Sequence, residues 1–195
     1  MAQRTTDRRR ELLDAAVRVF ARKGFHSARV GDIAEEAGVA HGLLYHYFRS
    51  KDEVLETIFR ETWDLLQSDT ERIEHSGAPL REQLRRFARI YLGSWLATPD
   101  LVSVLVREIA RGRGVGGGWI EIRGVIESLQ RMIEAAKSRG DVRRDCNAVL
   151  ATWGVYGALE EILTGWVLGQ LPAREPDVER AVATVVDVAW AGLAA

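Results

Sequence analysis

A dense group of polar and aromatic side chains occupies residues 41–51, which read HGLLYHYFRSK. Imidazole, phenol and amine groups can bind a metal ion, transfer protons, or donate hydrogen bonds to a charged partner. His41 and His46 lie five residues apart, and on a helix that spacing turns them away from a shared face, unlike the i, i+4 pair of a helical metal site. We therefore predict no metal site, and contact with a charged partner is the favoured chemistry.

The rest of the chain offers little for catalysis. The four histidines all lie near the N-terminal end: His26, His41, His46 and His75. The larger C-terminal part has no imidazole to activate a nucleophile, and Glu160 and Glu161, being adjacent, point apart. Residues 111–119 fit G-x-G-x-x-G, but no strand precedes them and no GK[ST] follows, so they predict only a connection between helices. We expect neither enzymatic activity nor a cofactor.

Composition narrows the class of protein. The 195 residues are 47% hydrophobic and 28% charged, enough for one or two compact domains. Cys146 is the single cysteine, and the longest uncharged apolar stretch, residues 148–159, is too short to cross a bilayer. The N-terminus has no signal-peptide core. We expect a cytoplasmic protein without a membrane partner.

Charge is distributed unevenly along the chain. Residues 1–51 carry ten Lys and Arg against six Asp and Glu, a net charge of +4, whereas residues 52–195 carry 17 against 22, a net charge of −5. A basic first quarter on an acidic body predicts a polyanion contact confined to the N-terminal part, although a solvated charged face gives the same counts.

Helical periodicity runs along nearly the whole chain, which predicts an all-α fold of about nine helices. The first two predicted helices, 8–23 and 28–37, are each followed by a glycine, Gly24 and Gly38, that can adopt the left-handed conformation. Further helices are predicted at 41–48, 51–75, 80–97, 100–111, 119–139, 145–170 and 176–193. At the start of the fourth, Ser50-Lys51-Asp52-Glu53 fits a capping box. In this motif the Ser50 hydroxyl accepts a hydrogen bond from the Glu53 N–H, and the Glu53 carboxylate accepts one from the Ser50 N–H.

Two short helices joined by a three-residue turn, with a longer helix before them, form a helix-turn-helix whose second helix enters the DNA major groove. The core side of that second helix is predicted to be Leu43, Leu44 and Phe48. The residues predicted to approach base edges are Ala40, His41 and Gly42, and those predicted to donate to phosphates are Tyr45, His46, Tyr47 and Lys51.

Residues 8–59 resemble the DNA-binding domain of the TetR family of bacterial repressors. The family pattern V-x-D-I-A-x-x-A-G-V and then L-Y-x-Y-F-x-[ST]-K is matched by VGDIAEEAGV and LYHYFRSK, without an insertion. The chain departs from the family at Ala28 and Arg29, where Thr or Ser is frequent, and at Ala40, where Ser or Thr is common. We expect Arg29 to replace a hydroxyl contact to phosphate.

The resemblance implies a homodimeric repressor of double-stranded operator DNA. Its DNA-binding domain would span 1–51 and its effector-binding and dimerisation domain 52–195, with the last two long helices pairing between subunits. Small residues in 148–171 suit such close helix packing: Gly154, Gly157, Gly165 and Gly169. The predicted interface residues are Glu161, Thr164, Trp166, Val186 and Trp190. The alternative is that these helices only close the core of their own subunit.

Residues 101–171 resemble the TetR-type repressors of fatty-acid degradation, which respond to long-chain acyl-CoA. The resemblance implies a small hydrophobic effector of that class in an apolar tunnel, with Arg107 near the CoA phosphates. The alternative is a repressor of an efflux or catabolic operon that senses a cationic or aromatic compound beside Glu160. The predicted effector-binding residues are Leu66, Tyr91, Trp95, Arg107, Trp153, Tyr156, Leu159 and Glu160.

Overall fold

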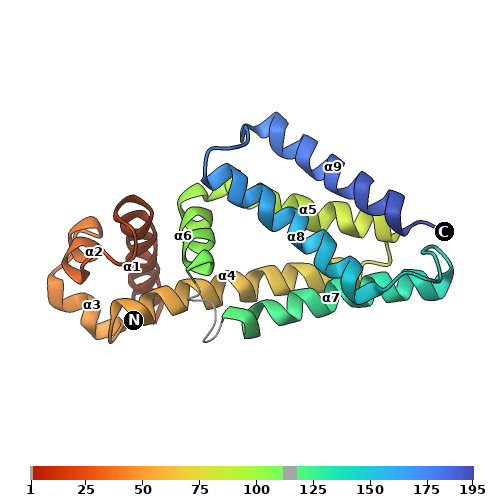
Figure 1. The fold of residues 1–195 in the computed structure, drawn as a ribbon. Helices are drawn as coiled ribbons and strands as arrows, with labels where there is room; N and C mark the ends of the chain where they lie inside the picture. Colours follow the sequence, from red (N-terminus) through yellow and green to blue (C-terminus); the bar gives the residue numbers. More distant parts are fainter. Residues whose placement is uncertain (1, 112–117) are drawn as a thin grey trace. The chain divides into compact units, whose positions relative to one another are not determined.

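A computed structural model of the chain describes residues 2–111 and 118–195, and the side chains of residues 7–111 and 122–195. The described residues form nine α-helices and no β-strand, which confirms the predicted all-α fold (Figure 1). The helices are α1 (Ala2–Lys23), α2 (Val30–Glu36), α3 (His41–Tyr47), α4 (Lys51–Glu74), α5 (Leu80–Ala97), α6 (Pro99–Ala110), α7 (Gly118–Arg139), α8 (Ala148–Val167) and α9 (Glu175–Leu193). The predicted connection through Gly112, Gly114 and Gly117 lies outside the described residues.

The chain divides into two compact units. The first consists of residues 1–62 and 100–118 and holds α1, α2, α3, the first half of α4, and α6. The second consists of residues 63–99 and 119–195 and holds the remainder of α4 with α5, α7, α8 and α9. The segment predicted to bind DNA, residues 1–51, therefore lies wholly within the first unit.

The core of the first unit is built on the apolar face of α1. Leu12, Ala16 and Phe20 follow one another at four-residue intervals and are buried, as helical periodicity predicts. Ile33 of α2 and Leu44 of α3 are fully buried as well. Removing side chains of this size from water stabilises the fold by about 1.5 to 3 kcal/mol each, so this core fixes where the α2–α3 pair lies on α1.

Ion pairs set the orientation of α2 on α1. Glu36 accepts hydrogen bonds from Arg18 at 2.8 Å and from Arg22 at 2.9 Å, and Asp32 accepts from the Lys23 ammonium at 2.8 Å. The Arg18 and Arg22 hydrogen bonds hold the pKa of Glu36 below its usual range. Exposed pairs contribute little stability, so their main effect is to select one arrangement of the two helices.

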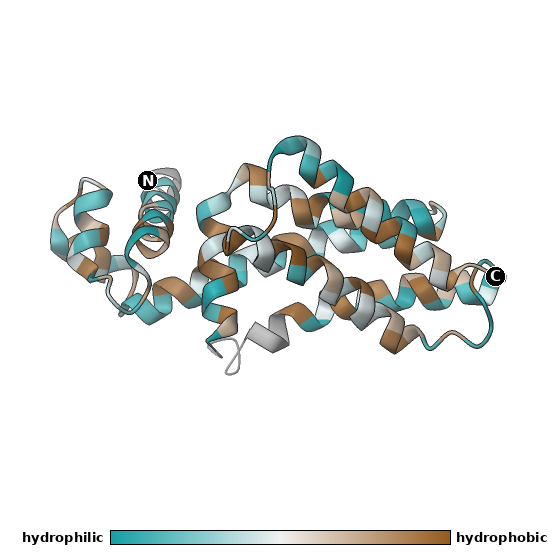
Figure 2. Cartoon of the chain, turned by 45° about the horizontal axis from the view of Figure 1, so that its top comes forward, coloured by the Kyte–Doolittle hydropathy of each residue, from teal (hydrophilic) through white to brown (hydrophobic). Residues whose placement is uncertain are grey.

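The second unit packs α5 against α8 and α9. Phe87 and Leu92 of α5, Leu159 of α8 and Val182 of α9 are fully or nearly fully buried in its core. Hydrophobic and hydrophilic stretches are interspersed along most of the helices, as amphipathic packing requires (Figure 2).

Cys146 lies in the connection between α7 and α8 and is buried. The C-terminal residues return to this connection, where Val142 and Ala194 form an isolated β-bridge. In the part of the chain that the structure describes, no helix has the length and apolar character needed to cross a membrane.

Candidate nucleic-acid interface

The turn between α2 and α3 sets the direction of α3. Gly38 has φ +65°, a left-handed conformation that side chains rarely adopt, and Val39 N–H donates to the Ala34 carbonyl at 2.9 Å. Ala40 then adopts an extended conformation as the N-cap of α3. Gly38 therefore ends α2 as predicted and allows the chain to reverse within three residues.

Helix α3 has one core side and one exposed side. Leu44 and Phe48 are buried as predicted, whereas Leu43 is only half-buried. The exposed residues are Ala40, His41, Gly42, Tyr45 and His46, and Tyr47 is half-buried. All of the residues predicted to reach base edges are thus accessible on one short helix.

His41 and Tyr45 lie one turn apart on the exposed side, with their ring centroids 6.0 Å apart. The His41 ring rests against Gly31 of α2, where an added Cβ would lie 3.1 Å from its Cε1 atom. The small residue at 31 therefore gives the imidazole room beside α2. Tyr45 is 54% exposed and has its hydroxyl available to a partner.

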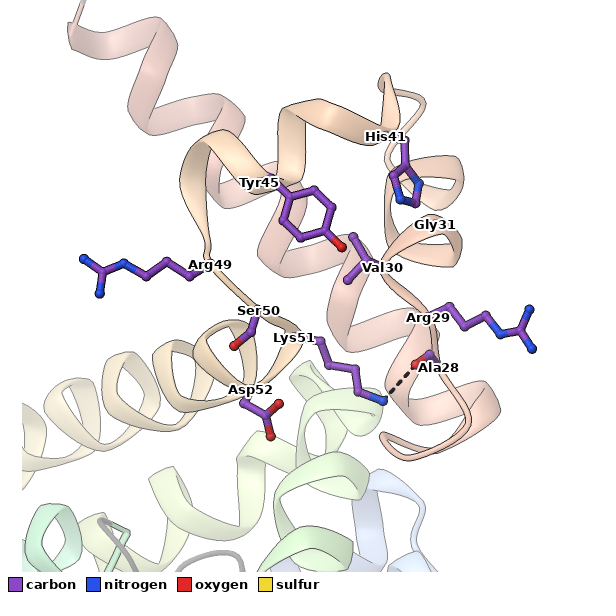
Figure 3. A pocket seen from close by; sticks show the side chains of 10 residues that line it. All are labelled: Ala28, Arg29, Val30, Gly31, His41, Tyr45, Arg49, Ser50, Lys51 and Asp52. Carbon is purple, nitrogen blue, oxygen red and sulfur yellow. Dashed lines mark hydrogen bonds between the residues drawn. The ribbon is translucent and has the colours of Figure 1, made fainter.

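A surface hollow of about 480 Å³ lies beside these rings. Its walls come from the start of α2, from α3 and from the start of α4 (Figure 3). The side chains of Arg29 and Arg49 extend from opposite sides of it into solvent, as Figure 3 shows. Arg29 is one of the phosphate contacts predicted from the sequence, whereas Arg49 is not among them. The sequence signal for Arg49 is its positive charge directly before the Ser50 cap.

Lys51 has partners that the sequence did not predict. Its ammonium donates to the carbonyls of Phe25 at 2.8 Å, His26 at 3.2 Å and Ala28 at 2.9 Å, and it lies 4.5 Å from the centroid of the Phe25 ring. An ammonium group has three N–H donors, so these carbonyls use all of them. In this arrangement Lys51 has no donor left for a phosphate, contrary to its predicted role.

The start of α4 is capped almost as predicted. The Glu53 N–H donates to the Ser50 hydroxyl at 3.1 Å, but the Glu53 carboxylate accepts from the Arg49 N–H at 2.6 Å instead of from Ser50. The Glu53 side chain therefore reaches one residue further back than predicted and fixes the backbone N–H of Arg49. Among the described residues no group of His, Cys, Asp and Glu is arranged to hold a metal ion.

The predicted effector residues of the second unit include a buried polar cluster. The Tyr91 hydroxyl donates to the Glu160 carboxylate, and the Tyr156 hydroxyl lies 3.2 Å from both the Tyr91 hydroxyl and Glu160. Burial raises the pKa of both tyrosines above the usual range, with Tyr156 and Glu160 adding to the effect at Tyr91. The Trp153 ring packs edge-on against Tyr156, with centroids 6.3 Å apart.

The remaining effector candidates are more dispersed. Leu66 and Leu159 are buried, and Trp95 donates to the Ala173 carbonyl at 3.2 Å while packing against Trp166. Arg107 belongs to the first unit, where it donates to the Ala21 carbonyl at 3.1 Å near the end of α1. Its guanidinium is therefore engaged within the first unit, and a contact with CoA phosphates stays a prediction.

The predicted interface residues on α8 and α9 divide into two kinds. Glu161 is exposed, and Thr164 and Trp190 are half-buried, so these three are accessible on a single chain. Trp166 and Val186, only 4% and 1% exposed, are covered by other parts of their own chain, and their place in an interface stays a prediction. A helical pattern shows which residues share a face of a helix, not which neighbour covers that face.

The small residues of α8 also serve different purposes. A Cβ added at Gly154 or Gly157 would meet open space, whereas one at Gly165 would lie 2.8 Å from the Leu171 side chain. Gly169 has φ +68° and follows the end of α8. Only Gly154 and Gly157 therefore leave room for a helix from outside the subunit.

Comparison with known proteins gives a consistent set of similarities. Residues 12–58 match the family model described as bacterial regulatory proteins, tetR family. The HTH-type transcriptional repressor Rv1474c of Mycobacterium tuberculosis is 30% identical over 168 residues, which cover 81% of this chain and 83% of that protein. The fatty acid metabolism regulator protein of Bacillus subtilis is 26% identical over 160 residues, covering 81% and 82%.

The fold is similar to that of a solved structure as well. The transcriptional regulator FadR from Bacillus subtilis, in complex with stearoyl-CoA, superposes with a TM-score of 0.83 at 23% identity, over 93% of this chain and 97% of that chain. The similarity in fold therefore extends beyond the helix-turn-helix and covers most of the chain.

Proposed function

Because this chain belongs to the TetR family of bacterial regulatory proteins, we propose that it is a cytoplasmic transcriptional repressor that binds operator DNA as a homodimer and is released by a small hydrophobic effector. The observation that carries the DNA-binding part is the exposed side of α3. His41 and Tyr45 project from it, beside a hollow flanked by Arg29 and Arg49. A short helix with a buried apolar side and an exposed polar start fits the major groove.

The residues at this surface have two proposed roles. Ala40, His41 and Gly42 form the exposed start of α3 and are proposed to approach base edges. Arg29, Arg49, Tyr45, His46 and Tyr47 are proposed to contact phosphates, which fixes the register on the duplex without reading sequence. Changing His41 to alanine should therefore alter base preference, whereas changing Arg29 or Arg49 to glutamine should weaken binding to all sequences.

The homodimer is proposed to pair through the exposed sides of α8 and α9. Leu150, Trp153 and Val188 are large apolar residues that remain exposed on the single chain, and Gly154 and Gly157 leave open space beside them. Packing these surfaces on a second copy would cover them. The two α3 helices of the dimer would then enter successive major grooves, about 34 to 36 Å apart.

A long-chain acyl-CoA is the proposed effector. Its support is the similarity to the Bacillus subtilis fatty acid metabolism regulator and to the fold of FadR, which was solved with stearoyl-CoA. The cluster of Tyr91, Tyr156 and Glu160 favours a second candidate, a cationic or aromatic hydrophobic compound, because aromatic rings and a carboxylate are the groups that bind such ligands. In either case the effector must bind one dimer conformation better than the other, by about 1 to 3 kcal/mol.

The experiment starts from duplexes selected by the protein from a random library. If the protein is a phosphate-binding dimer, its affinity for a selected duplex should fall by roughly a thousandfold or more between 50 and 200 mM salt. Stearoyl-CoA should then release the duplex, and free CoA should not. Absence of salt-dependent binding would contradict the repressor, whereas release by a benzyl quaternary ammonium but not by stearoyl-CoA would favour the second effector class.

A further inference from the structure

The first residue of α4 joins two segments that are more than twenty residues apart in the sequence. The Lys51 ammonium binds three carbonyls of the α1–α2 connection, at Phe25, His26 and Ala28. We propose that Lys51 is a positioning residue for DNA binding, which fastens this connection to the start of α4, and that it is not itself a phosphate contact. The part of this proposal that concerns DNA binding rests on the proposed function.

The chemistry of the site suits a lysine. Three carbonyl oxygens converge on one point, and a compact ammonium with three N–H groups can satisfy them together. The Phe25 ring lies 4.5 Å from the nitrogen and contributes a cation–π attraction. Phe25 is buried and packs edge-on against Phe20 of α1 at 5.1 Å, so the far end of this arrangement is anchored in the core.

The fastened connection leads directly to the proposed DNA contacts. Ala28, whose carbonyl binds Lys51, precedes Arg29, the N-cap of α2. The Arg29 N–H donates to the Asp32 carboxylate at 2.8 Å, which fixes the backbone at that point. Lys51 therefore couples the start of α4 to the start of α2, where Arg29 is the N-cap.

Two substitutions separate positioning from phosphate contact. Lys51→Met keeps an unbranched side chain, one atom shorter than lysine, but removes all three donors. Lys51→Arg keeps the positive charge, but its planar guanidinium cannot place three donors on three converging carbonyls. A phosphate contact would tolerate arginine, whereas the carbonyl cluster would not. Arg49→Gln is the matched control, because Arg49 is an exposed cation beside the same hollow.

The first measurement is the affinity of each full-length variant for a selected duplex at several salt concentrations. Both Lys51 variants should bind roughly tenfold more weakly than the wild type, with an unchanged slope of log affinity against log salt. Arg49→Gln should lower that slope by about one. Normal affinity in Lys51→Arg, together with a slope lowered by about one in Lys51→Met, would overturn the proposal.

The second measurement is hydrogen exchange of the same variants without DNA. The amides of residues 24–32 should exchange faster in both Lys51 variants, while those of residues 12–20 in α1 keep their protection. Unchanged exchange at 24–32, or loss of protection throughout α1, would contradict a local positioning role. Because no DNA is present, this result decides the role of Lys51 even if the wild type binds no duplex, in which case the proposed function fails separately.

Discussion

At the scale of single residues, two polar side chains join segments that lie far apart in the sequence. The Lys51 ammonium donates to three carbonyls of the α1–α2 connection. The Glu160 carboxylate accepts hydrogen bonds from Tyr91 of α5 and from Tyr156 of its own helix, α8. Each of the two side chains therefore has at least one partner more than twenty residues away.

The Tyr91 hydroxyl should make stability depend on pH in the alkaline range. Its pKa is raised in the folded state by burial, whereas the unfolded chain ionises near pH 10. Stability from this group is present below pH 10 and is lost as pH rises from 10 toward the folded pKa, by up to about 1.4 kcal/mol per pH unit. Wild type should therefore lose stability more steeply above pH 10 than Tyr91→Phe.

Chemical denaturation of both proteins at pH 7 and above pH 10 tests this. At pH 7 the variant should be less stable by about 1 to 2 kcal/mol, because it lacks the hydrogen bond to Glu160. The gap should narrow above pH 10. Tyr45→Phe, at an exposed tyrosine of α3, is the control and should match wild type at every pH. A difference in stability between the two proteins that stays constant with pH would show that folding does not raise the pKa of the Tyr91 hydroxyl.

At the scale of elements, most helix boundaries follow from local chemistry. Gly24 and Gly38 follow the ends of α1 and α2 with positive φ, and Ser50 caps α4, all as the sequence predicts. These features could be predicted because each depends on neighbours within about four residues. The shift of the Glu53 hydrogen bond from Ser50 to Arg49 shows where local prediction ends.

Two glycines of the helix-turn-helix, Gly38 and Gly42, should respond in opposite ways to substitution by alanine. Gly38→Ala should destabilise the protein by about 1 to 2 kcal/mol, because Gly38 has φ +65°, a conformation that strains a residue with a Cβ. An added Cβ would meet no other atom within 4 Å, so this backbone strain is the whole cost. Gly42→Ala should stabilise it by about 0.5 to 1 kcal/mol, because Gly42 lies within α3 and a Cβ there meets open space. Thermal melts of both variants give the comparison, and destabilisation of equal size at both sites would contradict it.

At the scale of the whole molecule, the sequence predicts the number and order of helices but not which apolar faces stay uncovered. Trp166 and Val186 are buried in their own subunit, while Leu150 and Val188 are not. All four belong to apolar helical stretches, so periodicity treats them alike. Whether a neighbouring helix covers them depends on the packing of α5, α8 and α9, which a single sequence does not specify.

Leu150→Glu should break the proposed homodimer. Leu150 is 68% exposed on the single chain, and an unpaired carboxylate in the interface costs about 3 kcal/mol, roughly a hundredfold in the dimer Kd. The change should not harm α8 itself, because Asn147 caps that helix and glutamate is favoured three residues after a cap. Leu65→Glu, at a leucine of α4 that is 63% exposed, is the matched control and should remain a dimer in sedimentation velocity. Dissociation of neither variant, or of both, would contradict the proposed interface.

The buried position of Cys146 makes the chain suitable for spectroscopic labelling. Its thiol is covered in the connection before α8 and the sequence has no other cysteine, so thiol reagents should leave the native protein unmodified. A cysteine introduced at the exposed His46 position would then carry a single spin label on α3 of each subunit. In the proposed homodimer, the distance between the two labels would report how far apart the α3 helices lie and whether stearoyl-CoA changes that separation.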